Sequence, residues 1–350
     1  MKYKDLLRQW EDAIWNRKIN EAKDLAEVIS NHSIDKQSPH YLITLASYYL
    51  LIKDVKKAND ILNTFNVFTN DIDGKLLFMY YHLLGVTQYY KKIYQESIEN
   101  FLEAERFLVH IRNEPLKIAE FHYKFASSYY EAMQISNSIK QANIALRIYK
   151  DNFEFERAAD CENLLGIINK EIGQYKEAKK HYINSLKYAE AFNDKVKKAM
   201  IYHNLGSLFA KKNDSTEAIR YYRIALDLIN ELEIKEWKLK TLYLLSKEHL
   251  KLGNEEGKVW VKEGLKLSLE LENEEYQHHF KMLLTRYDGN IEDIDRVFEE
   301  GICYFISKKM WRYVKEYGIL HGTFMKSKYI HEKASHYFYL AFQADQQINR

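Results

Sequence analysis

The sequence predicts an all-α protein: an N-terminal helical bundle over residues 1–68, followed over residues 75–350 by a right-handed α-solenoid of about seven helical hairpins. Three observations predict this class. A pattern of small and aromatic residues returns about every 40 residues, apolar residues recur at helical spacing, and the 350 residues include only 2 Pro and 12 Gly. Because so few Pro and Gly leave little room for special turns, long helices with short connections fit best.

Residues 1–68 precede the repeat and read as four helices. Their predicted ranges are 6–15, 19–28, 39–52 and 55–62. Ser38 suits an N-cap and Pro39 suits the first helical position, so together they mark the start of the third helix. Residues 69–74 (Thr-Asn-Asp-Ile-Asp-Gly) are the first clear linker.

The repeat is clearest between Asn163 and Leu228, where one pattern occurs twice. Gly166, Ala178, Tyr182 and Ser185 return as Gly206, Ala218, Tyr222 and Ala225, each 40 positions later. In hairpins of the tetratricopeptide type, a small residue on the first helix lets the second helix approach closely. Because the usual period is about 34 residues, a period of 40 indicates longer helices or longer turns.

From Lys75 onward, the second helix of each hairpin has an aromatic or apolar residue three positions before a small one. The pairs are Phe101/Ala104, Ala142/Ala145, Tyr182/Ser185, Tyr222/Ala225, Val261/Gly264, Phe298/Gly301 and Phe338/Ala341. They are separated by 41, 40, 40, 39, 37 and 40 residues, a register that chance does not readily produce. The hairpin around 288–290 is degenerate.

The first helix of each hairpin is expected to line the concave groove of the solenoid. The register places polar residues there, including Tyr123, Asp160, Asn163, His203, Asn204, Tyr243 and Lys247. An asparagine side chain both donates and accepts hydrogen bonds, and lysine attracts carboxylates, including a free C-terminus, so the lining suits an extended peptide. For any single residue, an ordinary solvated position is the alternative.

Composition excludes several classes of protein. The net charge is +2, with 52 basic and 50 acidic residues, which argues against a broad nucleic-acid or membrane surface. Cys161 and Cys303 form no CxxC motif and read as free thiols. The first ten residues are too charged for a signal peptide, and no apolar run reaches transmembrane length. We therefore expect a cytoplasmic protein without nucleic-acid or membrane partners.

No motif predicts a self-contained active site. The segment Gly253–Lys258 resembles a phosphate loop, but it has three residues between its glycines instead of four and reads as a hairpin turn. His278 and His279 are predicted to be surface residues. Because no Ser/His/Asp or Cys/His arrangement is visible, we expect no metal and no cofactor of the protein's own.

Four groups of residues together match one family. They are Gln9-Trp10 with Ile14 and Asn20-Glu21-Ala22; Gln37 with Leu45; Ala119–Tyr130 (AEFHYKFASSYY), the most specific; and Tyr202–Gly206 with the hairpin at 334–341. On these residues the chain resembles the Rap family of response-regulator aspartate phosphatases of bacilli, from about Leu7 to Gln347. The resemblance implies a cytosolic receptor with a helical bundle and a tetratricopeptide-like solenoid.

The resemblance also implies a catalytic residue. In this family a glutamine of the bundle enters the active site of a response regulator and orients a water toward its phosphoaspartate, while the regulator supplies the divalent ion. Gln37 matches that position, so Asp35 and Tyr41 beside it are predicted partner contacts; a solvated linker glutamine is the alternative. This chain departs from the family in having Lys36 where an acidic residue is usual, and in having Pro39.

The solenoid groove would then receive a short signalling peptide, which favours a compact arrangement that cannot hold the regulator. The resemblance assigns Asn204 to the peptide, whereas Tyr123, Asp160, Asn163 and Lys247 follow from the register. A non-catalytic protein that sequesters a response regulator or a transcription factor is the main alternative, and a general peptide scaffold is a third. A DNA-binding receptor is not expected, because no helix-turn-helix domain precedes the bundle.

Overall fold

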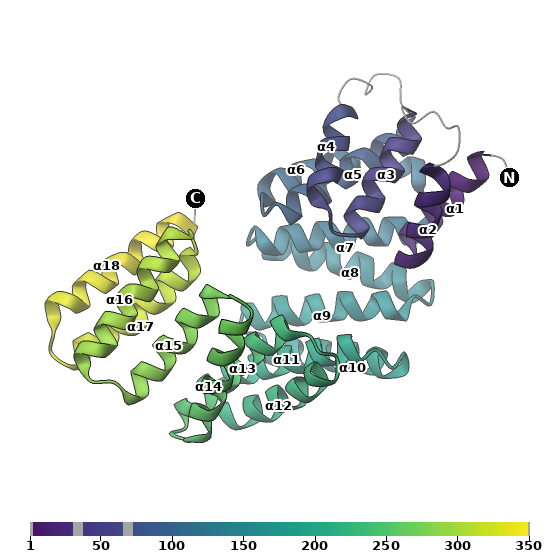
Figure 1. The fold of residues 1–350 in the computed structure, drawn as a ribbon. Coiled ribbons are helices and arrows are strands. Elements are labelled where there is room, and N and C mark those ends of the chain that lie inside the picture. The colour runs from purple at the N-terminus through teal and green to yellow at the C-terminus, as the bar shows by residue number, and fades with distance from the viewer. Residues whose placement is uncertain (1–2, 31–37, 66–72, 349–350) are drawn as a thin grey trace. The chain divides into compact units, whose positions relative to one another are not determined.

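The structure, a computed structural model, describes residues 3–30, 38–65 and 73–348, and every regular element in these ranges is a helix (Figure 1). The all-α prediction is therefore confirmed. The α-helices are α1 (Tyr3–Trp15), α2 (Ile19–Ser30), α3 (Pro39–Leu51), α4 (Val55–Thr64), α5 (Gly74–Tyr90), α6 (Tyr94–Glu105), α7 (Pro115–Glu131), α8 (Ile135–Asp151), α9 (Phe155–Glu171), α10 (Tyr175–Ala191), α11 (Lys195–Lys211), α12 (Ser215–Glu231), α13 (Lys235–Lys251), α14 (Glu256–Glu270), α15 (Glu274–Asp288), α16 (Ile291–Ser307), α17 (Trp311–Ser327) and α18 (His331–Ile348), and a short 3₁₀ helix, η2 (Leu108–Ile111), precedes α7.

The 40-residue period follows from the lengths of these helices. Each helix from α7 to α13 has 17 residues, and three-residue turns separate them. The second residue after each of these helices has a positive φ: Met133, Phe153, Gly173, Asn193, Asn213, Glu233 and Gly253. A left-handed residue here lets the following N–H groups bond back to the last carbonyls and stops the helix. Each helix with its turn thus takes 20 residues, so the period is long because the helices are long.

The small and aromatic residues of the repeat meet inside the hairpins, as the register predicts. Tyr182 and Tyr222 on the second helices are 0% and 1% exposed. A Cβ added to Gly166 would lie 2.5 Å from the ring of Tyr182, and one added to Gly206 would lie 2.5 Å from the ring of Tyr222. Because 2.5 Å is far inside van der Waals contact, both first-helix positions need glycine while the rings stay where they are.

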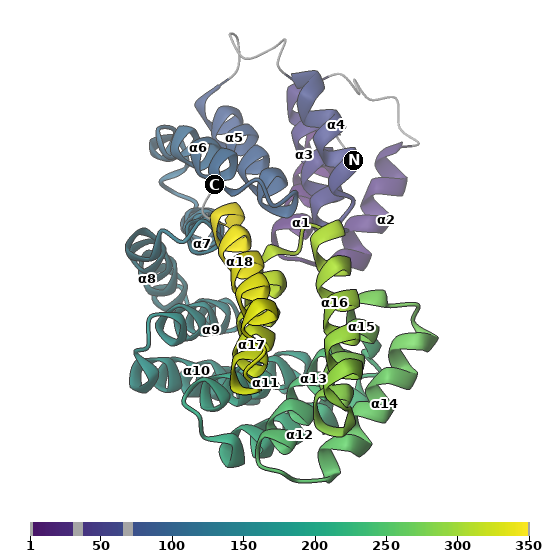
Figure 2. The same cartoon turned by 90° about the vertical axis from the view of Figure 1, so that its left-hand side faces the viewer.

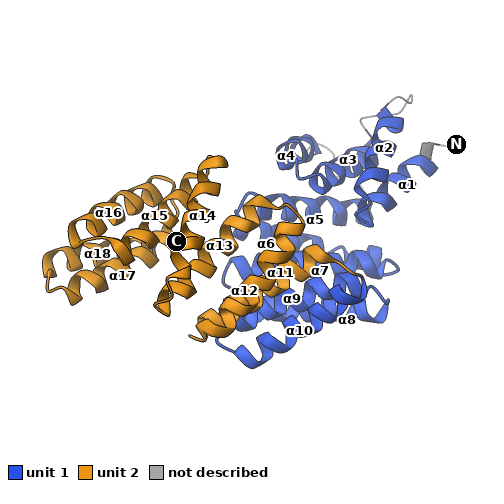
Figure 3. Ribbon diagram, turned by 60° about the horizontal axis from the view of Figure 1, so that its bottom comes forward, with its two compact units in different colours: residues 1–192 blue, residues 193–350 orange. Residues whose placement is uncertain are grey.

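The chain divides into two compact units, residues 1–192 and 193–350 (Figure 3). In the first, α3 and α4 lie beside α5 (Figure 2), and the buried Ile43 and Leu62 belong to one apolar core with Phe78. The second hairpin of the predicted bundle therefore packs like a further repeat. Gly74, which was expected in the linker, instead starts α5, because the Asp73 side chain caps that helix.

The α1–α2 hairpin has a core of its own around Trp10. This side chain is 1% exposed, and its indole Nε1 donates a 2.8 Å hydrogen bond to the carbonyl of Ala22. The bond satisfies the one polar atom of an otherwise apolar ring, so Trp10 fixes α1 against the start of α2.

The second unit contains α11 to α18. Its last four helices share a core that includes Phe298, Phe305 and Tyr317. The degenerate hairpin differs at its turn: Gly289 has an extended conformation, and Asn290 caps α16 through the backbone N–H of Asp293. None of the described helices combines the length and the apolarity that crossing a membrane requires.

Candidate functional site

The segment that contains the predicted catalytic residue leads into α3. Gln37 and Asp35 lie outside the described residues. Helix α3 starts at Pro39, as predicted, although the Ser38 side chain makes no capping hydrogen bond. Tyr41 is 8% exposed, and its ring centroid lies 6.2 Å from that of Trp10, so the ring belongs to the core of the bundle. Its contact with a partner stays a prediction.

An ionic network joins the α1–α2 turn to α7 and α9 within the first unit. Arg17 in this turn has one guanidinium nitrogen 3.1 Å from Glu120 Oε2 and the other 3.3 Å from Asp160 Oδ2. Arg157 on α9 lies 3.1 Å from the same Glu120 oxygen and donates a short hydrogen bond to the carbonyl of Trp15. Two arginines, one from the bundle and one from the repeats, thus share one carboxylate.

Glu120 is the centre of this network and is 8% exposed. Burial alone would raise its pKa, but the positive charges of Lys124, Arg17 and Arg157, with a 2.9 Å hydrogen bond from the Tyr149 hydroxyl, lower the pKa to about 2. A buried carboxylate that stays ionised is stable only while its partners are in place. The position of the α1–α2 turn is therefore coupled to the charge of Glu120.

Glu11 makes a second ionic contact between the bundle and the repeats. It is buried, and its pKa is lowered to about 2 because His40 and Lys117 outweigh the effect of burial. Its oxygens lie 3.2 Å from His40 Nε2 and 2.5 Å from Lys117 Nζ. Because Lys117 is on α7, this pair joins α1 to the same helix that carries Glu120.

Three of the predicted peptide contacts belong to the first unit. Asp160 pairs with Arg17, and Tyr123 lies in the same cluster, where burial and the nearby Asp160 raise the pKa of its hydroxyl. Asn163, one turn along α9, is 7% exposed. The structure brings Asp160 and Tyr123 together around an arginine of the bundle, which the sequence did not predict. Contact with a peptide stays a prediction for all three.

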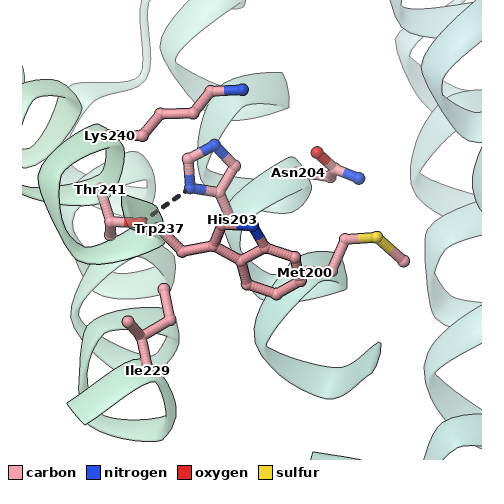
Figure 4. A pocket seen from close by; sticks show the side chains of 7 residues that line it. All are labelled: Met200, His203, Asn204, Ile229, Trp237, Lys240 and Thr241. Atoms are coloured by element: carbon pink, nitrogen blue, oxygen red, sulfur yellow. Dashed lines mark hydrogen bonds between the residues drawn. The ribbon is translucent and has the colours of Figure 1, made fainter. Parts of the chain in front are cut away.

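The second unit has a cavity of about 180 Å³ beside Asn204 (Figure 4). Seven side chains from α11, α12 and α13 line it: Met200, His203, Asn204, Ile229, Trp237, Lys240 and Thr241. The Nδ1 of His203 lies 3.0 Å from the Thr241 hydroxyl, and this hydrogen bond joins α11 to α13. The bond fixes the imidazole in the wall of the cavity.

This lining suits one side chain of a peptide. Met200, Ile229 and Trp237 provide apolar surface, and the amide of Asn204 provides both a donor and an acceptor. A volume of about 180 Å³ is below the roughly 300–1,000 Å³ of typical small-molecule sites. A cavity of this size admits one apolar side chain, and contact of Asn204 with a peptide stays a prediction.

Lys247, the last predicted peptide contact, lines a different cavity. It is on α13, and its ammonium group lies 2.8 Å from Glu316 on α17. Asn204 and Lys247 are therefore not brought into one pocket, although α13 contributes to both cavities.

Sequence reasoning missed Trp237, Lys240 and Arg17. The repeat register predicts groove residues only near the small residue in the middle of each first helix. Trp237 lies instead in the first turn of α13. Its spacing of four from Thr241 puts both on one helix face, and this spacing is the signal that could have found it. Arg17 has no such signal, because Glu120 and Asp160 are 103 and 143 positions away.

Two motifs have clear outcomes. Gly253, with φ +70°, lies in the turn after α13, so the hairpin-turn interpretation is confirmed. The prediction that His279 is a surface residue is wrong: it is 2% exposed, and its Nδ1 lies 2.5 Å from the Tyr317 hydroxyl, because α15 turns this position toward α17. Among the described residues, no three His, Cys, Asp or Glu side chains are grouped to hold a metal ion.

Known proteins match this chain along most of its length. A tetratricopeptide-repeat family model matches residues 157–231. The transcriptional activator NprA of Geobacillus stearothermophilus is 26% identical, over 95% of this chain and 85% of its own length. Response regulator aspartate phosphatase I of Bacillus subtilis is 22% identical, over 98% of this chain and 90% of its own length. The resemblance to the Rap family is confirmed.

The structural comparison agrees with this conclusion on the fold. A crystal structure of a Rap protein complexed with competence and sporulation factor has a TM-score of 0.77 and 19% identity, and covers 98% of this chain and 97% of that one. At this identity the likeness concerns the fold. The relatives of this Rap-like chain include a protein named as a phosphatase and one named as a transcriptional activator, so their names agree on regulation and differ on catalysis.

Proposed function

We propose that this chain is a cytoplasmic, peptide-controlled regulator that binds a response regulator and hydrolyses its phosphoaspartate. The observation that carries the proposal is the cavity beside Asn204, which combines an amide with an apolar wall on the helix that the register assigns to ligand binding. The Rap structure with competence and sporulation factor and the relative named as a phosphatase support the same assignment.

In the proposed reaction, the partner supplies the phosphoaspartate and its divalent ion, and this chain supplies Gln37. The glutamine carbonyl accepts a hydrogen bond from a water, and its NH₂ group donates to a phosphoryl oxygen. The water oxygen then attacks phosphorus in line, the bond between phosphorus and the aspartyl oxygen breaks, and the aspartate leaves as a carboxylate. The water proton passes to the released phosphate.

The peptide would inhibit by favouring the arrangement in which the bundle is packed on the repeats. A ligand shifts such an equilibrium only by the difference in its affinity for the two states. The contacts of Arg17 with Glu120 and of Glu11 with Lys117 are features of the packed arrangement within the first unit. Regulation therefore requires that peptide binding and these bundle contacts favour the same state.

The test is the lifetime of phosphate on a panel of purified, phosphorylated receiver domains. For the receiver that forms a complex, the wild type should shorten this lifetime, and Gln37→Ala should lose at least about 100-fold of the acceleration because it no longer positions the water. Gln95→Ala, at an exposed position of α6, is the matched control and should keep full activity.

A second candidate is a non-catalytic protein that sequesters a response regulator or a transcription factor. Lys36 stands where the family has an acidic residue, and the relative NprA is named as a transcriptional activator; both observations favour it. A stable complex in which the wild type leaves the phosphate lifetime unchanged would establish this candidate and reject the enzyme.

A further inference from the structure

A second cavity in the unit 193–350 lies between α13, α15 and α17. Its volume is about 30 Å³, roughly that of one water molecule. Its polar lining consists of Tyr243, Lys247, His279, Arg286, Glu316 and Tyr317, and the rest of its wall is apolar. A cavity this small and this polar has room for one polar atom of a ligand, held by hydrogen bonds.

One guanidinium nitrogen of Arg286, which lines this cavity and also the cavity beside Gly289 and Asn290, lacks an acceptor. Its Nη1 is shielded from solvent and has no hydrogen-bond partner among the described residues. A guanidinium nitrogen in this state has lost its water without gaining an acceptor, which is unfavourable. Because arginine has donors only, the group that completes the site must bring a lone pair, and an anionic oxygen provides the strongest one.

The neighbouring hydroxyl groups do not provide this acceptor. The hydroxyls of Tyr243 and Tyr317 lie 2.9 Å apart, and the Tyr317 hydroxyl lies 2.5 Å from His279 Nδ1. These three groups bond to one another across α13, α15 and α17. They form a fixed polar wall against which a ligand can be placed.

Lys247 contributes a second positive charge that a ligand can reach. It lies 2.8 Å from Glu316, and the two side chains are 40% and 48% exposed. Exposed pairs of this kind contribute little to stability, so an incoming carboxylate can take the place of Glu316. Among the charged residues that line the cavity, two cations face one carboxylate, so the lining itself carries a net positive charge that attracts an anion, although Glu275 lies 3.7 Å from His279 at its edge.

Helix α13 sets the distance between this cavity and the one beside Asn204. Thr241 lines the Asn204 cavity, and Lys247, six residues later, lines this one. At 1.5 Å per residue the separation along the helix is about 9 Å, which an extended peptide covers with about three residues. Because this axial separation is the least distance between them, a peptide needs at least about three residues to reach both cavities.

We propose that this site binds a carboxylate at the C-terminal end of the peptide that occupies the Asn204 cavity, with Arg286 and Lys247 as its cationic partners. The proposal rests on the peptide-binding function proposed above and adds its ligand chemistry. The main-chain terminus and an acidic side chain close to it offer the same group. The side chain in the Asn204 cavity then lies at least about three residues before the carboxylate.

The test uses three fluorescein-labelled random hexapeptide pools and the full chain. The first pool has a free C-terminus and no Asp or Glu, the second is the same pool amidated, and the third is amidated with Glu fixed at the last position. In fluorescence anisotropy the first pool should bind at least about 10-fold more tightly than the second, as expected for hydrogen bonds between charged groups. If the third pool binds as tightly as the first, the site accepts a carboxylate from the main chain or from a side chain. If the third pool binds as weakly as the second, the site recognises the main-chain terminus.

Variants connect this preference to the site. Arg286→Gln and Lys247→Gln should reduce the ratio between the first two pools toward one, whereas Lys262→Gln, exposed on α14, should leave it unchanged. The thermal melt of Arg286→Gln shows whether this variant folds. If it does not, the carboxylate site is tested by Lys247→Gln and by comparing the pools on the wild type. Equal binding of the first and second pools, with both weakened by Trp237→Ala, would overturn the carboxylate site and leave peptide binding intact. Binding by none of the pools would overturn both.

Discussion

The replacement Glu120→Gln tests whether charge holds the bundle on the repeats. Glutamine keeps the shape of glutamate and can still accept the hydrogen bond from Tyr149, but it removes the negative charge that Arg17 and Arg157 share. Because Glu120 is only 8% exposed, solvent screens this charge weakly. The substitution therefore isolates the ionic part of the contact.

The magnitude follows from the pKa of Glu120. Lowering it from 4.5 to about 2 corresponds to about 3 kcal/mol of stabilisation by the ionised form at pH 7. Because the folded pKa lies below the unfolded one, this contribution is fully present above pH 4.5 and is lost as the pH falls toward 2. At pH 3 about half of it remains. The raised pKa of Arg17 reflects the same attraction and is not added.

The assay is urea unfolding of wild type and variant at pH 7, 5, 4 and 3, with hydrogen exchange of the α1–α2 hairpin as the local readout, because two units need not unfold together. We expect Glu120→Gln to lose about 3 kcal/mol at pH 7, and the difference from wild type to shrink by about half at pH 3. Glu103→Gln, whose pair with Arg106 is exposed, should cost less than about 1 kcal/mol. A loss of stability that is the same at every pH would refute the ionic explanation.

Three further results are expected. Gly206→Ala should lower the free energy of unfolding by about 1–3 kcal/mol in urea titrations, because the new Cβ meets the ring of Tyr222. Asn204→Ala and Trp237→Ala should each weaken binding of the free-acid hexapeptide pool by about tenfold or more in anisotropy titrations, and Trp237→Ala should also lower the melting temperature because its ring packs against Ala199, Ala225 and Ile229. Burial lowers the pKa of His82 to about 4, so ¹⁵N NMR should show a neutral imidazole at pH 5.5; since its folded pKa lies below the unfolded value, stability falls as the pH drops from 6.5 to 4.

The fold could be predicted because packing inside each hairpin restricts the residue type at two positions, one on each helix. Gly206 has no room for a side chain because the buried ring of Tyr222 packs against it. Glycine and tyrosine are therefore both required, and this requirement is visible in the sequence as a regular pattern. The 20-residue step of helix and turn spaces these positions evenly. The packing of α3 and α4 onto α5 could not be predicted in the same way, because Ile43 and Leu62 join that core outside the register.

The candidate site was only partly predictable. The register placed Asn204 in the groove and the family resemblance assigned it to the peptide, and it does line a cavity, but neither pointed to Trp237 in the same wall. The contact of Arg17 with Glu120 depends on a turn that meets α7 only after the chain has folded, and no local pattern records it. The burial of His279 could not be predicted, because helical spacing shows that His278 and His279 point to different sides of the helix but not that the side of His279 faces α17.

Packing positions are easier to predict than ligand contacts because the two kinds of position are constrained by different things. Positions such as Gly166 and Gly206 are determined by the partner helix, so substitutions there reduce stability whatever the protein binds. Lys247 lies at a cavity wall and its pair with Glu316 is exposed, so a loss of binding with little loss of stability is the expected signature of a ligand contact there. Asp160 is the informative exception. Because it already pairs with Arg17 of the bundle, its substitution should affect both stability and regulation. That double effect would identify α9 as the helix on which ligand binding and bundle packing meet.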